Sequence, residues 1–150
     1  MDTLERAISN ALGDHLGTVV EVDRLRRVGG GDINEAGVVE TSAGTFFVKW
    51  NAAAPADLFA REAEALELMR ASGTQLRIPR PVVHRDRGAE DGGPGFLVME
   101  YLESGSPASD WEETYGRGLA QLHKMSPGEL ADPPEAPYGF PHDNYCGTTP

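Results

Sequence analysis

The feature that most constrains this chain is a glycine-rich loop followed by a lysine inside an apolar strand. The loop is GGGDIN, from Gly29 to Asn34, and it lies between two valine-containing segments. The lysine is Lys49, in FFVKW, about twenty residues further on. Glycines leave room for an anion and let several backbone N–H groups point at it. A glycine triplet alone is usually a plain turn, but this order favours a lid over the phosphates of a nucleotide.

Two other phosphate-binding patterns do not fit. In a dinucleotide-binding fold the glycines would precede a helix, whereas here they lie between two predicted strands. The sequence contains no Gly-Lys-Ser or Gly-Lys-Thr, so the Walker pattern is absent.

A carboxylate on the next predicted helix supplies a partner for Lys49. Helical spacing places four residues on one face: Phe59, Glu62, Leu66 and Met69. Glu62 therefore lies on an apolar stripe, while Glu64 and Glu67 lie off it and are expected in solvent. A carboxylate facing a core is costly unless it is paired, and so is an ammonium in an apolar strand. We predict an ion pair between Lys49 and Glu62. The alternative is that both side chains reach solvent at the sheet edge.

The segment MEYL, from Met99 to Leu102, ends a buried-looking strand and leads into a linker. At such a hinge the carbonyl of Glu100 and the N–H of Leu102 can pair with the edge of an adenine, and Met99 can form the back wall of its pocket. An isolated Met-Glu-Tyr-Leu would be only a strand end. Its position after the lysine strand and the helix favours the hinge interpretation.

Periodicity and turn residues predict an α+β fold. The expected strands cover residues 18–28, 36–41, 45–50, 82–85 and 96–101, and the expected helices run from Leu4 to near Gly13, from about Pro55 to 71, and from Trp111 to near Lys124. This order predicts a five-stranded, mostly antiparallel sheet with one helix inserted after the third strand. The last helix carries an apolar stripe of Trp111, Tyr115, Leu119 and Leu122, which we expect to be exposed or to drive self-association.

Composition excludes several classes of partner. The net charge of -11 and the excess of acidic over basic residues argue against nucleic acid and against an anionic membrane surface. No apolar run approaches the roughly 20 residues that span a bilayer, and the charged start lacks the apolar core of a signal peptide. A single cysteine, Cys146, favours a reducing cytoplasm. The four histidines show no metal-ligand spacing.

These features together resemble the bacterial fructosamine (ketosamine) kinase family. The resemblance runs from about Val19 to Pro150, through VGGGDINEAG, FFVKWN, RIPRPVV, FLVMEYL, LAQLHKM and YGFPHDNYCGTTP. It implies a protein-kinase-like fold close to the aminoglycoside phosphotransferases, with a nucleotide-binding lobe at 1–102 and the start of a helical lobe at 103–150. It also implies that ATP and Mg²⁺ are used to phosphorylate a sugar hydroxyl of a glycated amine.

The resemblance assigns the expected ATP-binding residues. They are Gly29, Gly30, Gly31, Asp32, Ile33 and Asn34 over the phosphates, Lys49 oriented by Glu62, and Met99, Glu100, Tyr101 and Leu102 around the adenine. The polar loop of His142, Asp143 and Asn144 resembles the substrate side of the family.

The family's later motifs are missing. The His-Gly-Asp-Leu sequence with the catalytic aspartate does not occur, nor do the magnesium ligands that follow it in the family. His84-Arg85-Asp86 precedes the hinge, so it is predicted to be a strand end and not a catalytic loop. We therefore expect residues 1–150 alone to be inactive. Two alternatives stay open: a non-catalytic nucleotide-binding or scaffolding lobe, and a phosphotransferase acting on an aminoglycoside or another small alcohol.

Overall fold

The computed structural model describes residues 2–29, 33–87, 93–124, 143–145 and 149. Its elements are α1 (Thr3–Leu16), β1 (Val22–Val28), β2 (Glu35–Thr41), β3 (Gly44–Asn51), α2 (Leu58–Ala71), β4 (Pro81–Arg85), β5 (Gly95–Glu100) and α3 (Trp111–Lys124). Among these described elements, no helix is long and apolar enough to cross a bilayer.

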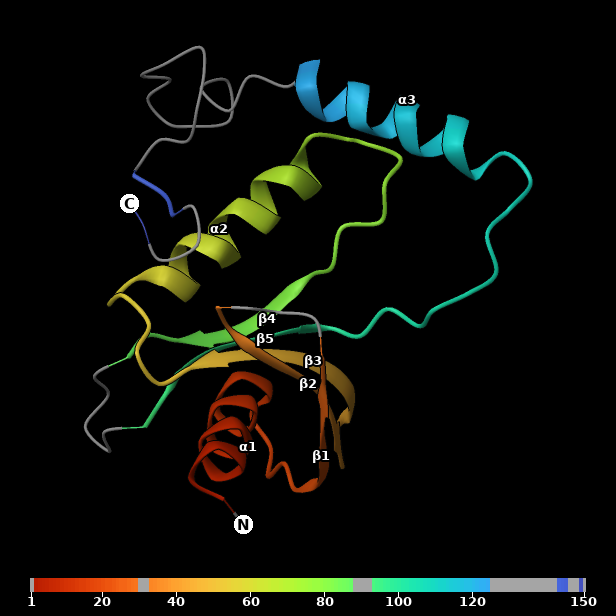
Figure 1. The fold of residues 1–150 in the computed structure, drawn as a ribbon. Helices are drawn as coiled ribbons and strands as arrows, with labels where there is room; N and C mark the ends of the chain where they lie inside the picture. Colours follow the sequence, from red (N-terminus) through yellow and green to blue (C-terminus); the bar gives the residue numbers. More distant parts are fainter. Residues whose placement is uncertain (1, 30–32, 88–92, 125–142, 146–148, 150) are drawn as a thin grey trace.

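The five strands form one antiparallel sheet in the order β1-β2-β3-β5-β4. Helix α1 covers one face of the sheet and α2 covers the other (Figure 1). Strand β5 lies between the two layers, and its residues from Gly95 to Met99 are all buried. The predicted α+β architecture, with one helix inserted after the third strand, is confirmed.

The register of β3 against β5 decides which side chains face which helix. Lys49 lies opposite Leu97, and Val48 lies opposite Val98. Val48 and Val98 belong to the core beneath α1, whereas Leu97 belongs to the core beneath α2. Because side chains alternate along a strand, Lys49 projects on the α2 side of the sheet.

Several predicted boundaries were wrong, most by one to four residues. Helix α1 continues past Gly13 to Leu16 and is capped by Gly17, whose φ of 67° is left-handed. Gly13 has a packing reason instead, since a Cβ there would lie 2.9 Å from the carbonyl oxygen of Thr18. Strand β1 begins at Val22, not at residue 18, and β5 ends at Glu100, one residue early. These are errors of extent and leave the order of elements unchanged.

Helix α3 lies apart from the sheet, beyond the C-terminal end of α2 (Figure 1). Hydrogen bonds attach it to the loop that follows α2: the Thr74 hydroxyl donates to the Gly118 carbonyl at 2.8 Å, and the Gln75 amide donates to the Thr114 carbonyl at 2.6 Å. Of the predicted apolar stripe, Trp111 and Tyr115 are about half exposed, at 51% and 53%. Leu119 and Leu122 are half-buried.

Candidate active site

The predicted ion pair is present. The Nζ of Lys49 donates to Oε1 of Glu62 at 2.5 Å. Both side chains are partly buried, with exposed fractions of 29% and 28%. Water therefore screens this pair less than an ion pair on an open surface, and its geometry restricts the lysine amine to one direction.

Helix α2 presents Glu62 to Lys49 through its apolar contacts. Phe59, three residues before Glu62, is fully buried, and Leu66, four residues after it, is partly buried against the same core. The core is formed with Leu97 and Met99 of β5. The predicted inward stripe therefore exists, and the carboxylate lies within it. Glu67 is exposed as expected, whereas Glu64 is half-buried and accepts a hydrogen bond from Arg61 at 3.0 Å.

The described end of the glycine-rich loop is attached to the lysine strand. Asn51, at the end of β3, donates from Nδ2 to the Ile33 carbonyl at 3.1 Å and to Oδ1 of Asn34 at 3.0 Å. Sequence reasoning missed Asn51, although its position two residues after Lys49 was a usable signal. Of the other predicted loop residues, Gly30, Gly31 and Asp32 lie outside the described residues.

Within the part of the chain that the structure describes, neither packing nor backbone conformation requires glycine at position 29. A Cβ built there would meet no atom within 4 Å, and the φ of Gly29 is not positive. Close packing and unusual backbone conformation are the two common structural reasons for a glycine. Among the described residues neither reason applies to Gly29, and no atom lies close to the position of a side chain there.

In the hinge segment the side chain of Met99 is buried, whereas that of Glu100 points toward Arg77 and Arg80. Met99 is buried at 5% exposure in the core beneath α2. The carboxylate of Glu100 accepts from Nη2 of Arg77 at 2.6 Å and from the backbone N–H of Arg80 at 3.3 Å. The Arg77 hydrogen bond, followed by that from Arg80, lowers the pKa of Glu100. Tyr101 and Leu102 follow the strand in irregular backbone and are half-buried.

An open pocket of about 460 Å³ adjoins this segment, lined by Arg70, Leu76, Arg77, Ile78, Arg80 and Glu100. Lys49 and Glu62 do not line it, so the pocket belongs to the outer side of the hinge and not to the ion-pair site. The Glu100 side chain is therefore engaged on this outer side of the hinge.

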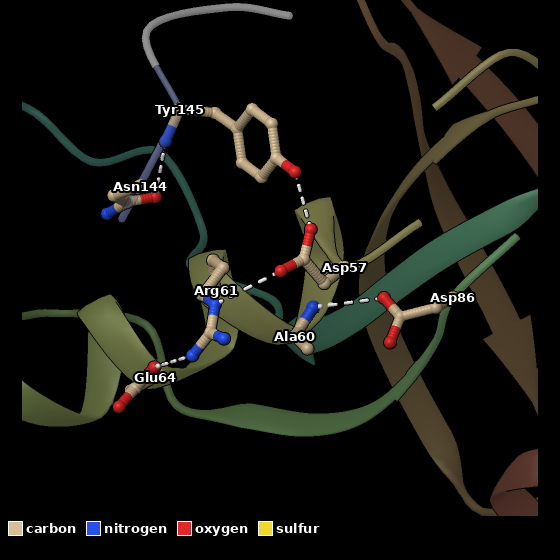
Figure 2. Close-up of polar contacts among 7 residues, drawn as sticks. All are labelled: Asp57, Ala60, Arg61, Glu64, Asp86, Asn144 and Tyr145. Carbon is tan, nitrogen blue, oxygen red and sulfur yellow. Dashed lines mark hydrogen bonds and ion pairs between the residues drawn. The ribbon is translucent and has the colours of Figure 1, made fainter. Parts of the chain in front are cut away.

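The first turn of α2 is held by groups from two other segments (Figure 2). Asp86, just after β4, accepts the backbone N–H of Ala60 at 3.2 Å and so satisfies one of the unpaired donors at the helix start. The prediction that His84-Arg85-Asp86 is a strand end is confirmed, since β4 ends at Arg85. The hydroxyl of Tyr145 donates to Oδ1 of Asp57 at 2.5 Å.

Sequence reasoning missed this cluster. Tyr145 and Asp57 are 88 residues apart, and no local pattern links them. Of the polar loop that was singled out, His142 lies outside the described residues. Asn144 accepts the backbone N–H of Tyr145 at 2.8 Å.

The sequence matches the fructosamine kinase family over residues 4–150. The chain belongs to that family. It is 34% identical over 134 residues to the chloroplastic protein-ribulosamine 3-kinase of Oryza sativa subsp. indica, covering 89% of this chain and 36% of the relative. It is 32% identical over 145 residues to a Synechocystis protein named as a probable ketoamine kinase, covering 97% of this chain and 45% of the relative.

The fold of this fructosamine kinase family member also matches a crystal structure. A Haemophilus somnus 129PT protein assigned as a fructosamine-3-kinase superposes with a TM-score of 0.73 at 22% identity, over 93% of this chain and 43% of the other. This supports the kinase-like fold. The chain spans less than half the length of the relatives it matches.

Proposed function

We propose that these residues form the ATP-holding lobe of a kinase that phosphorylates a sugar hydroxyl of a glycated amine. The observation that carries the proposal is the Lys49–Glu62 pair, which fixes an amine on the α2 side of the sheet. In kinase-like sites such a lysine binds the phosphates of ATP and the glutamate orients it. The named activities of the relatives, ribulosamine and ketoamine kinases, supply the class of acceptor.

The remaining residues fit a nucleotide bound in the same way. Gly29, Ile33 and Asn34 border the place of the phosphates, with Asn51 holding the last two against β3. The open space at Gly29 suits a bound ligand. The backbone of Glu100 and Leu102 would meet the adenine, with Met99 behind it. When bound, Mg²⁺ would neutralise phosphate charge. The sequence offers no set of magnesium ligands of the family's kind.

Nucleotide binding tests the ion-pair site directly. We expect the chain to bind ATP more tightly than adenosine, because the lysine contributes only when phosphates are present. Lys49→Ala should weaken ATP binding on the order of tenfold or more and leave adenosine binding unchanged. The sequence contains one other lysine, so Lys124→Ala on α3 is a matched control. Isothermal titration that gives equal affinities for ATP and adenosine in the unaltered chain would overturn the proposal.

A phosphoryl-transfer assay tests the part of the proposal that concerns catalysis. We expect residues 1–150 to show no transfer from ATP to fructosyl-lysine, because no base for the acceptor hydroxyl is recognised in the sequence. ATP-dependent phosphorylation of fructosyl-lysine that is lost in Lys49→Ala would show that the chain carries its own catalytic groups.

The exposed aromatic residues of α3 favour a second proposal, which is self-association. Trp111 and Tyr115 are half exposed on one helix face. Leaving such side chains in water forgoes about 1.5–3 kcal/mol each relative to full burial. Sedimentation velocity over a range of concentrations should show a dimer that Trp111→Ser abolishes. A monomer at every concentration would exclude this proposal and leave the first one intact.

A further inference from the structure

Tyr145 joins a segment far along the chain to the first turn of α2. Besides its hydrogen bond to Asp57, its ring packs against the core beneath α2, which includes Leu58 and Phe59. Figure 2 shows the tyrosine hydroxyl directed at one oxygen of the Asp57 carboxylate, while Arg61 approaches the other oxygen. Tyr145 therefore makes both a polar and an apolar contact at this end of α2, although it follows the hinge in the sequence.

Asp57 occupies the residue before α2, yet its side chain makes no capping hydrogen bond to the helix backbone. It accepts from Tyr145 and, at 3.3 Å, from Nε of Arg61, which also bonds Glu64. The Tyr145 hydrogen bond lowers the pKa of Asp57, and the same bond raises the pKa of Tyr145. The Asp57 carboxylate is therefore engaged by Tyr145 and Arg61. The side chain of Asp86 accepts a backbone N–H at the start of the helix in its place.

Helix α2 is anchored at this end. Its buried residues are Leu58, Phe59 and Ala63, all in its first half, and its second half is half-buried or exposed. Glu62 lies five residues after Asp57 in the same anchored half. A small rotation or shift of this end would carry the Glu62 carboxylate away from Lys49.

From this arrangement we propose that Tyr145 is a positioning residue for the phosphate-binding lysine. By holding Asp57, it keeps the first half of α2 in the orientation in which Glu62 reaches Lys49. The inference rests on the proposed function for its biological meaning. Its physical content is that the Tyr145–Asp57 contact and the Lys49–Glu62 pair stabilise each other.

The two lysines of the sequence allow a test without nucleotide. Lys49 must leave Glu62 before its amine can attack an acylating reagent, whereas Lys124 is exposed at the end of α3. Mass spectrometry after brief acetylation gives the rate at Lys49 relative to Lys124. Tyr145→Phe keeps the ring and removes the hydroxyl, and it should raise this ratio roughly three- to tenfold. Tyr115→Phe, on exposed α3, is the matched control and should leave it unchanged.

A second variant and a second background make the test specific. Asp57→Ala removes the acceptor and should raise the same ratio. In a Glu62→Gln background Lys49 should already react faster because its ionic partner is removed, so Tyr145→Phe should add nothing. An unchanged ratio in Tyr145→Phe would overturn the proposal, as would a rise that persists in Glu62→Gln. Equal acceleration at Lys49 and Lys124 would mean general loosening and would also overturn it.

Nucleotide binding separates this inference from the proposed function. If ATP protects Lys49 from acetylation in the unaltered chain, Tyr145→Phe should reduce that protection. If ATP gives no protection at all but the ratio still rises in Tyr145→Phe, the positioning role stands and the proposed ATP site fails.

Discussion

Strand β5 and helix α3 show two different ways in which segments of this chain are held. From Gly95 to Met99, β5 is buried between α1 and α2, and its neighbours are strands on both sides. The only buried residue of α3 in the described structure is Gly118, and the helix is attached mainly by hydrogen bonds to the loop after α2. The difference predicts that the sheet layers unfold cooperatively, whereas α3 can loosen by itself.

The largest effect should come from the core on the α2 side. Phe59 is fully buried, so Phe59→Ala should lower the free energy of unfolding by about 3–5 kcal/mol. Urea denaturation followed by circular dichroism measures this, and Phe59→Leu, which removes less volume and should cost less, serves if the alanine variant does not fold. Tyr115→Ala on exposed α3, measured at a concentration where the chain is monomeric, should change stability by no more than about 0.5 kcal/mol. Comparable losses from Phe59 and Tyr115 would contradict the contrast between the two regions.

A smaller and local effect should follow from filling the contact under α3. A Cβ at Gly118 would lie 2.5 Å from Cγ of Leu76, so Gly118→Ala forces the helix and the loop apart at a cost of about 1–3 kcal/mol. Hydrogen exchange should then accelerate in α3 while β5 keeps its protection. Leu76→Ala should partly rescue Gly118→Ala by removing the clash. Faster exchange in β5 as well would show that α3 and the sheet unfold as one unit.

The order of elements and the ion pair could be predicted because their signals are local. Lys49 stands out as a charge in an apolar strand, and Glu62 as a charge on an apolar helix stripe. Each needs a partner, so the pairing followed from the cost of burying charge. The end of α1 could not be predicted, because Gly13 is a close-approach glycine inside the helix and not its end.

The contacts of Asp57 and Asp86 were beyond sequence reasoning for a different reason. Each is a common polar residue beside a turn, where solvent exposure is the usual expectation. Their partners are set by how distant segments of the chain meet at the start of α2: Asp86 binds the backbone of Ala60, and Asp57 binds the hydroxyl of Tyr145. Asn51 lies between these cases, since its place two residues after Lys49 could have linked it to the glycine-rich loop.

The smallest predicted effect is the pH dependence of the Tyr145–Asp57 contact, which tests whether the segment at 143–145 behaves like the sheet or like α3. The raised pKa of Tyr145 means that its contribution is full below the ordinary tyrosine pKa and is lost as the pH rises through the folded value. The lowered pKa of Asp57 means that its contribution is present above the ordinary aspartate pKa and is lost as the pH falls through the folded value. The contact should therefore persist between about pH 4 and pH 10 and weaken outside that range.

Absorbance at 295 nm follows the ionisation of tyrosine side chains and so resolves the alkaline limb. The sequence has four tyrosines. One of them, Tyr145, should ionise above the ordinary tyrosine pKa, and this late component should be missing in Tyr145→Phe. Asp57→Asn removes the neighbouring negative charge and should bring the ionisation of Tyr145 back toward the ordinary tyrosine pKa. If Tyr145→Phe instead removes a component that ionises at the ordinary tyrosine pKa, the Tyr145 hydroxyl is not held by Asp57, and the segment at 143–145 is attached no more firmly than the exposed face of α3. The return of the chain to α2 would then be too weak to position Glu62.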